Sequence, residues 1–165
     1  MSLCQVRTLQ QGGGFMLLSR EARLVSAITL LVVPTIMYGG WTLLGILTRG
    51  AVSPSPNVHL DETQWALWRA GHAHAGVWTI LSLLLQIFLD SARLSASAKW
   101  LARICAPLAA VLLSAGFFGV SVSVSFRWLV YLGVISMLIA LLLTVLGLIR
   151  DLRSGAEVGG QLERR

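Results

Sequence analysis

Two histidines, His72 and His74, lie inside a long apolar stretch, in the segment RAGHAHAGVW that covers residues 69–78. An ionisable side chain in the hydrocarbon of a bilayer costs about 2.5–3.5 kcal/mol on insertion scales, so such residues usually face the interior of a helix bundle and have a function. Imidazole nitrogens are suited to haem iron and to copper. This segment is therefore the strongest candidate for chemistry in the sequence.

The spacing of the two histidines limits what they can do together. At about 100° per residue on a helix, positions 72 and 74 are about 200° apart and point to opposite sides. Both could bind one ion only in a distorted helix, which the flanking Gly71 and Gly76 would allow. His74 must face a second neighbour or a ligand. His72 falls on a small or polar stripe that we expect to face other helices: Arg69, Gly76, Thr79, Gln86 and Asp90.

The elements that must position the histidines are membrane helices. Hydrophobic residues make up 56% of the 165 residues and charged ones only 12%, whereas a soluble domain carries roughly 25% charged residues. Four apolar runs are each long enough to cross a bilayer, at about 24–47, 65–89, 100–121 and 128–149. The sequence predicts an all-α integral membrane four-helix bundle with up-down-up-down connections. It predicts one transmembrane domain over 20–150, with flexible tails at 1–19 and 151–165, and either Met1 or Met16 as the start.

The basic residues predict an orientation. They stand at the ends of the apolar runs and are not gathered on one face, which is typical of membrane topology and not of a nucleic-acid interface. Of the thirteen Lys and Arg residues, ten fall in the N-terminal tail, the second link and the C-terminal tail. These three segments share one side of the predicted membrane, and the opposite side has Arg49, Arg69 and Arg127. The positive-inside rule therefore predicts that both termini are cytoplasmic.

Matching the depth of the helices adds candidates around His72. At about 1.5 Å per residue, the layer of His72 coincides with Tyr38, Gly39 and Gly40 in the first span and lies close to Met137 in the fourth. Methionine suits copper(I) or haem, and glycines leave room for a bound group. A cofactor site in the outer half of the bundle would thus draw on His72, His74, Tyr38 and Met137, with Arg69, Gly39, Gly40, Gly71 and Gly76 around them. Gln86, further along the polar stripe, is an additional candidate.

Other interpretations of the same residues stay open. Histidines in membrane helices often only hydrogen-bond a group on a neighbouring helix, and in this simplest interpretation no cofactor is bound. A haem or copper site is the second interpretation, and a lipid or quinone-like pocket or a proton relay is the third. We expect Arg69 to extend toward the outer headgroups, near Asp61 or Glu62. We expect Asp90 to cap the cytoplasmic end of its helix near Arg93.

The string RAGHAHAGV at residues 69–77 follows a first span that contains Pro34 and the sequence GGW at 39–41. This combination resembles small uncharacterised multi-pass membrane proteins of bacteria. The resemblance covers the first two spans best and implies a place in the bacterial plasma membrane, without implying an activity. A looser likeness links His72 and His74 to the His-x-His segments of haem-copper-oxidase-like membrane proteins. The chain does not have the further histidines of an oxidase core, so this likeness does not imply oxidase activity.

Three classes of function are compatible with the sequence. Four helices with short links and no substantial soluble domain favour an accessory or structural subunit that docks on a larger membrane complex and is not itself an enzyme. The second class is a redox protein that binds haem or copper through His72 and His74. The third is a transporter-like element, which with four spans would act as a homo-oligomer. The sequence has none of the HExxH, GxSxG or Walker motifs of soluble catalytic modules.

Overall fold

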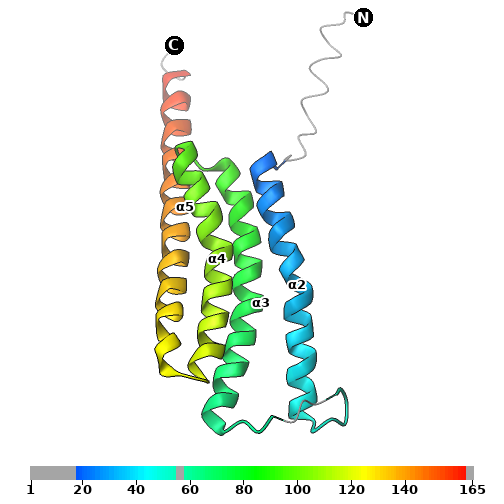
Figure 1. The fold of residues 1–165 in the computed structure, drawn as a ribbon. Helices are drawn as coiled ribbons and strands as arrows, with labels where there is room; N and C mark the ends of the chain where they lie inside the picture. Colours follow the sequence, from blue (N-terminus) through cyan, green and yellow to red (C-terminus); the bar gives the residue numbers. More distant parts are fainter. Residues whose placement is uncertain (1–17, 55–57, 163–165) are drawn as a thin grey trace, which may run out of the picture.

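Four long helices make up most of the structure, a computed structural model that describes residues 18–54 and 58–162, with side chains as far as residue 153. They are α2 (Arg20–Leu47), α3 (Glu62–Ser91), α4 (Ala96–Val120) and α5 (Arg127–Leu162), and a short 3-10 helix, η1 (Val124–Phe126), precedes α5 (Figure 1). All four long helices have the length and apolar composition to cross a membrane. The predictions of an all-α fold and of a multi-pass membrane protein are confirmed at this level.

Polar caps start three of the helices a few residues before the predicted spans. Ser19 and Ser95 each accept a hydrogen bond from the backbone N–H three residues later, and Asp61 forms a capping box with Gln64. Each cap satisfies backbone donors that the first turn of a helix leaves free. In consequence, α4 begins at Ala96 and includes residues that the sequence had assigned to a polar link.

The C-terminal end of α5 differs from the prediction. A flexible tail was expected from residue 151, because the segment is polar and contains glycines, but the helix continues to Leu162. No proline interrupts residues 150–162, and the arginines and leucine that follow Ile149 are good helix formers. The N-terminal tail, predicted for residues 1–19, falls almost wholly outside the described residues.

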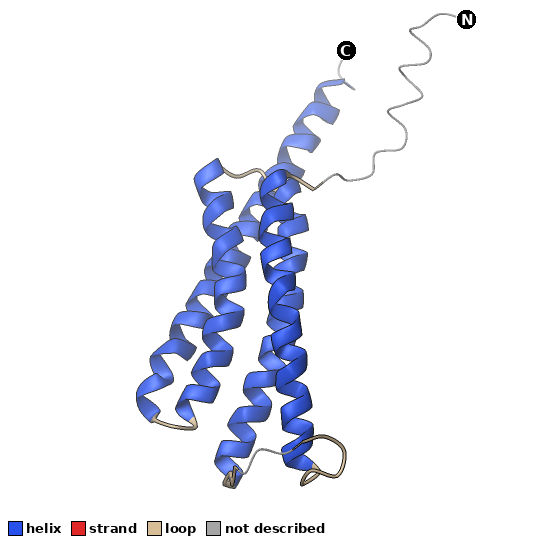
Figure 2. Ribbon diagram, turned by 45° about the vertical axis from the view of Figure 1, so that its right-hand side comes forward, coloured by secondary structure: helices blue, strands red, loops and turns tan. Residues whose placement is uncertain are grey.

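The helices form a compact group of three with the fourth at its side. Successive helices run in opposite directions, so that the start of α2, the α3–α4 link and the end of α5 share one end of the molecule (Figures 1 and 2). Helices α3, α4 and α5 pack against one another, whereas α2 packs on α3 and touches α4. Within the described residues α2 does not pack against α5. The bundle is therefore open on the side of α2.

Small residues bring α4 and α5 close together. A Cβ atom added at Gly116 would lie 2.7 Å from the backbone nitrogen of Val130, and one added at Gly133 would lie 2.8 Å from that of Leu113. Because lipid tails are as apolar as leucine, membrane helices associate through such close packing rather than through the hydrophobic effect. From these glycines toward the end with the α3–α4 link, Met137 and small residues of α4 fill the core.

We predict that Gly116→Ala destabilises the protein by about 1–3 kcal/mol, the usual cost of overpacking a tight interface. The control is Gly76→Ala on α3, where an added Cβ would meet nothing within 4 Å and where alanine favours the helix. Both variants are unfolded reversibly in mixed detergent micelles. The packing account fails if Gly116→Ala is as stable as the parent protein.

Candidate functional site

His72 lies against the backbone of α2, where two glycines face it. Its Nε2 atom is 3.0 Å from the position that a Cβ of Gly40 would take, and its Nδ1 atom is 3.7 Å from that of Gly39. A side chain at position 40 would therefore crowd the imidazole. The structure thus brings together three residues that the sequence had placed at one depth, and the glycines provide the space for the ring.

His74 faces away from His72 and contacts a different helix. Its Nδ1 atom lies 2.7 Å from the carbonyl oxygen of Ala70, and because a carbonyl only accepts, Nδ1 donates this bond. The His74 ring packs on Phe117 of α4, with 4.7 Å between the ring centres, and stacks near Trp78. The two imidazoles therefore serve the α2 and α4 sides of α3 and do not converge on one ion.

The other two members of the expected cofactor set lie elsewhere. Tyr38 is on the outside of α2 with 72% of its surface exposed, whereas Met137 is 1% exposed, in the core cluster with Leu85 and Cys105. Among the described residues, no group of three or more His, Cys, Asp or Glu side chains is close enough to hold a metal ion. Depth matching gave the height of these residues along the bundle but not the direction in which they point.

The remaining residues of the RAGHAHAGVW segment have separate positions. Arg69 is exposed and lines a shallow surface hollow with Glu62, although no ion pair between them forms in the described structure. Gly71 is buried against Phe117 and Phe118 of α4, where a Cβ would come within 3.2 Å of either side chain. Gly71 therefore serves helix packing, and Gly76 lies in open space.

A cavity of about 220 Å³ lies between α2, α3 and α4, and His72 forms part of its wall. The wall also includes Gly39 of α2, Thr79 of α3 and Ser114 of α4, and the remaining lining is mostly aliphatic or aromatic. The cavity exists because α2 stands apart from α4 and because glycine and alanine occupy the facing positions. Tyr38, His74 and Met137 are not among its lining residues.

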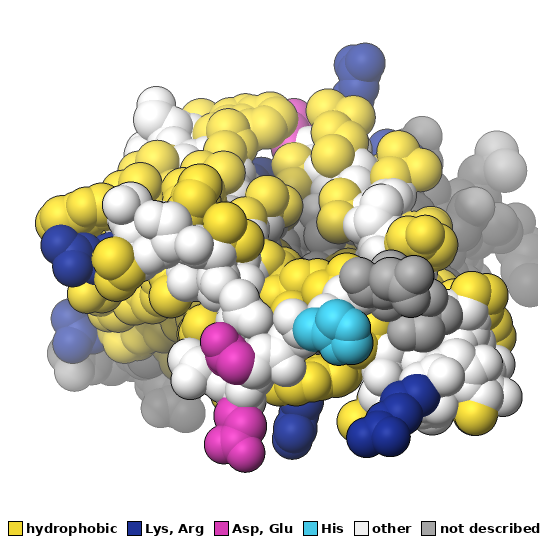
Figure 3. Space-filling model, turned by 60° about the horizontal axis from the view of Figure 1, so that its bottom comes forward, with side chains coloured by type: hydrophobic (Ala, Val, Ile, Leu, Met, Phe, Trp, Pro, Cys, Tyr) yellow, Lys and Arg dark blue, Asp and Glu magenta, His cyan; other side chains and the backbone are white. Residues whose placement is uncertain are grey.

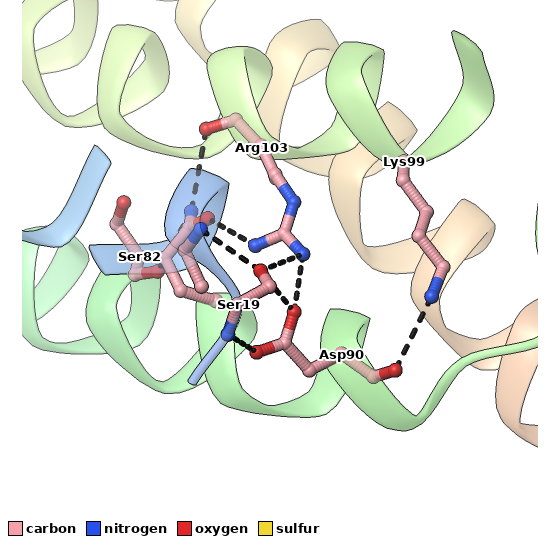
Figure 4. Close-up of polar contacts among 7 residues, drawn as sticks. Ser19, Ser82, Asp90, Lys99 and Arg103 are labelled. Carbon is pink, nitrogen blue, oxygen red and sulfur yellow. Dashed lines mark hydrogen bonds and ion pairs between the residues drawn. The ribbon is translucent and has the colours of Figure 1, made fainter. Parts of the chain in front are cut away.

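A second polar constellation lies at the opposite end of the same helices. We call it the Arg103 cluster, and it consists of Ser19, Gln86, Asp90, Lys99 and Arg103 (Figure 4). The Arg103 side chain is only 4% exposed and forms an ion pair with Asp90. Its guanidinium also donates to the Ser19 hydroxyl at 3.2 Å and to the Gln86 side-chain oxygen at 3.3 Å. One side chain of α4 thus holds the start of α2 and two positions of α3.

The other members complete the hydrogen bonding of the Arg103 cluster. The backbone N–H and the hydroxyl of Ser19 each donate to the Asp90 carboxylate at 2.8 Å. The Gln86 amide donates to the Arg103 carbonyl at 3.3 Å, and the Lys99 ammonium donates to the Asp90 carbonyl at 3.2 Å. A buried charge that is paired and hydrogen-bonded in this way avoids most of its desolvation penalty.

The Arg103 cluster corrects the expectation for Asp90, which pairs with Arg103 and does not cap its helix beside Arg93. Gln86, on the polar stripe of α3, is buried and binds Arg103 of α4. From sequence, Arg103 counted only as one of the basic residues of a polar link. A usable signal was present, because Gln86 and Asp90 are four residues apart on one helix and Lys99 and Arg103 are four apart on the next.

We predict that Arg103→Met destabilises the protein by about 3 kcal/mol or more, because it leaves the carboxylate of Asp90 without its counter-ion inside the helix group. The matched control is Arg69→Met, which removes an exposed arginine and is expected to change stability by less than about 0.5 kcal/mol. The free energy of unfolding of both variants is measured in mixed micelles. Equal stabilities would show that the ion pair does not hold the helices together.

Comparison with known proteins gives no relative from which a function could be transferred. No protein-family model, no curated protein and no solved structure matches this chain. Any function proposed for the chain must therefore be based on the geometry of the cavity, of the Arg103 cluster and of the exposed helix faces.

Proposed function

We propose that this chain is an accessory subunit of a membrane complex in the bacterial plasma membrane, with both termini in the cytoplasm. The observation that carries the proposal is the exposure of α2. Only 11% of its most apolar 18-residue window is buried within the chain, against 50% for the corresponding window of α4. We infer that the helix is fixed to the chain along one narrow side and offers the remainder to a partner.

A proline on the open side of α2 favours a protein partner over lipid. Pro34 is exposed in the middle of the helix and has no N–H to offer the carbonyl of Leu30, four residues earlier. Leu30 and Pro34 are both exposed, and we therefore infer that this carbonyl lies on the open face, near the middle of the helix. Lipid tails cannot donate a hydrogen bond, whereas a neighbouring transmembrane helix can. The proposed occupant of this face is a helix of a different membrane protein.

The proposed orientation is based on the unequal distribution of basic residues between the two ends of the four helices. The end that carries the start of α2, the α3–α4 link and the end of α5 holds these basic residues of the described chain: Arg20, Arg23, Arg93, Lys99, Arg103, Arg150 and Arg153. At the opposite end Figure 3 shows scattered charged side chains among many hydrophobic ones. The excess of Arg and Lys at the first end favours its placement in the cytoplasm.

The docking proposal predicts a position-specific photo-cross-link. With p-benzoylphenylalanine at Leu31 or Tyr38, which share one face of α2 and are 76% and 72% exposed, irradiated membranes should give an adduct with one and the same membrane protein. The control is the same label at Tyr131 on α5, 50% exposed, where only lipid adducts are expected. Mass spectrometry identifies the adducts.

Three outcomes contradict the docking proposal. Lipid adducts alone at Leu31 and Tyr38 would show that α2 faces the bilayer. Adducts between two copies of this chain would show a homo-oligomer instead. The same protein captured from Tyr131 would show that cross-linking reflects abundance and not a face of α2.

The orientation predicts the accessibility of two engineered cysteines in a background without Cys4 and Cys105. Val52→Cys, in the exposed loop after α2, should react in intact cells with a maleimide that does not cross membranes. Ser97→Cys, near the start of α4, should react only after permeabilisation. The reverse pattern would place the termini outside the cell.

A further inference from the structure

The cavity that His72 lines is apolar and is large enough for a six-membered ring. Its aliphatic and aromatic lining comes from three helices: Val32, Ile36, Ala75, Ala110, Val111 and Phe118. An apolar cavity of about 150 Å³ can hold benzene, so the volume of about 220 Å³ here admits a six-membered ring with a few substituents. The cavity is open to the surroundings of the helices, and a tail on the ring can therefore extend into lipid.

Two polar side chains of α3 face this apolar space without a partner. Within the described part of the chain, neither the His72 imidazole nor the Thr79 hydroxyl makes a hydrogen bond. The hydroxyls of Thr35 and Ser114, also in the wall, are already bonded to carbonyls of their own helices at 2.6 and 2.8 Å. Polar groups without partners in a membrane interior cost free energy, which a ligand that carries oxygen atoms would recover.

The depth of His72 selects an uncharged ligand. His72 lies ten residues, about 15 Å, along α3 from Glu62, which puts it below the level of the lipid headgroups. A phosphate or ammonium group would be costly at this depth, whereas a carbonyl or hydroxyl oxygen needs one hydrogen bond. The wall of the cavity contains His72 and, among its described lining residues, no other His, Cys, Asp or Glu that could help to bind a metal ion.

The geometry points to the cavity as a binding site for one quinone-like amphiphile: a six-membered ring whose carbonyl or hydroxyl oxygen is hydrogen-bonded to His72, with an apolar tail in the lipid. Thr79 lies seven residues further, on the same face of α3 and about 10 Å along its axis, where it can bind a second polar group. The combination of apolar walls and a few fixed polar groups is the usual composition of a small-molecule site. No reaction is assigned to this site, which is separate from the docking face of α2.

Decylubiquinone, a quinone with a short apolar tail, tests this inference on the full chain in detergent micelles. Quenching of tryptophan fluorescence reports binding, because Trp68 packs edge-on against Phe118 of the cavity wall. We expect saturable binding of one molecule per chain. His72→Leu should raise Kd about tenfold, the effect of one lost hydrogen bond. His74→Leu, on the same helix but outside the cavity, should change Kd less than twofold.

Decylbenzene, which has a ring and tail of similar shape but no oxygen, separates hydrogen bonding from apolar fit. It should bind the parent protein about as weakly as decylubiquinone binds His72→Leu. Should His72→Leu fail to fold, Ala75→Phe fills the cavity and should abolish quinone binding, whereas Val77→Phe, 64% exposed on the same helix, should not. Absence of saturable quinone binding, equal loss in His72→Leu and His74→Leu, equal affinity for decylbenzene, or binding retained in Ala75→Phe overturns the inference.

Discussion

The guanidinium of Arg103 joins three helices in a medium where apolar contacts give little driving force for association. From α4 it reaches Asp90 and Gln86 on α3 and Ser19 at the start of α2. The partners also donate hydrogen bonds of their own within the cluster, Ser19 to Asp90 and Gln86 to the Arg103 carbonyl, so nearly all polar groups of the cluster are hydrogen-bonded. Removal of Arg103 would leave the Asp90 carboxylate without its counter-ion, although Ser19 would still donate two hydrogen bonds to Asp90. We therefore expect the position of α2 to depend on Arg103.

The contrast between the two sides of α3 explains the cavity. On one side, Gly116 and Gly133 let the backbones of α4 and α5 approach closely. Helices α3, α4 and α5 therefore form a tightly packed group. On the other side, α2 is attached at the Arg103 cluster and again where His72 rests against Gly40. Between these two attachments α2 lies far enough from α4 to leave about 220 Å³ of space. The same separation leaves the outer face of α2 for a partner.

The fold was largely predictable from sequence because hydropathy and length decide which segments cross a bilayer. The helix ends were less predictable: α4 begins at Ala96, after the Ser95 cap and inside a predicted link, and α5 continues to Leu162 although its last turns contain glycines. For the site, helical periodicity indicated that His72 and His74 face opposite ways. It could not assign Tyr38 to the outside and Met137 to the core, because depth along a helix leaves the direction of a side chain undetermined.

The Arg103 cluster illustrates why tertiary contacts are hard to predict from residues taken one at a time. A basic residue near the end of an apolar run usually marks a cytoplasmic boundary, and Arg103 has that place in the sequence. Proximity along the chain favoured Arg93 as the neighbour of Asp90. The ion pair that forms instead spans thirteen positions, because α3 and α4 are antiparallel and their ends lie together.

The distance between α2 and α4 in a lipid bilayer tests the role of Arg103 most directly. Spin labels at Leu31 and Leu108, both exposed, permit its measurement by double electron–electron resonance in nanodiscs. If the Arg103 cluster fixes α2, the chain with Arg103 intact gives one narrow distance distribution, and Arg103→Met broadens it. A broad distribution with Arg103 intact, or a narrow one that Arg103→Met leaves unchanged, would contradict this role.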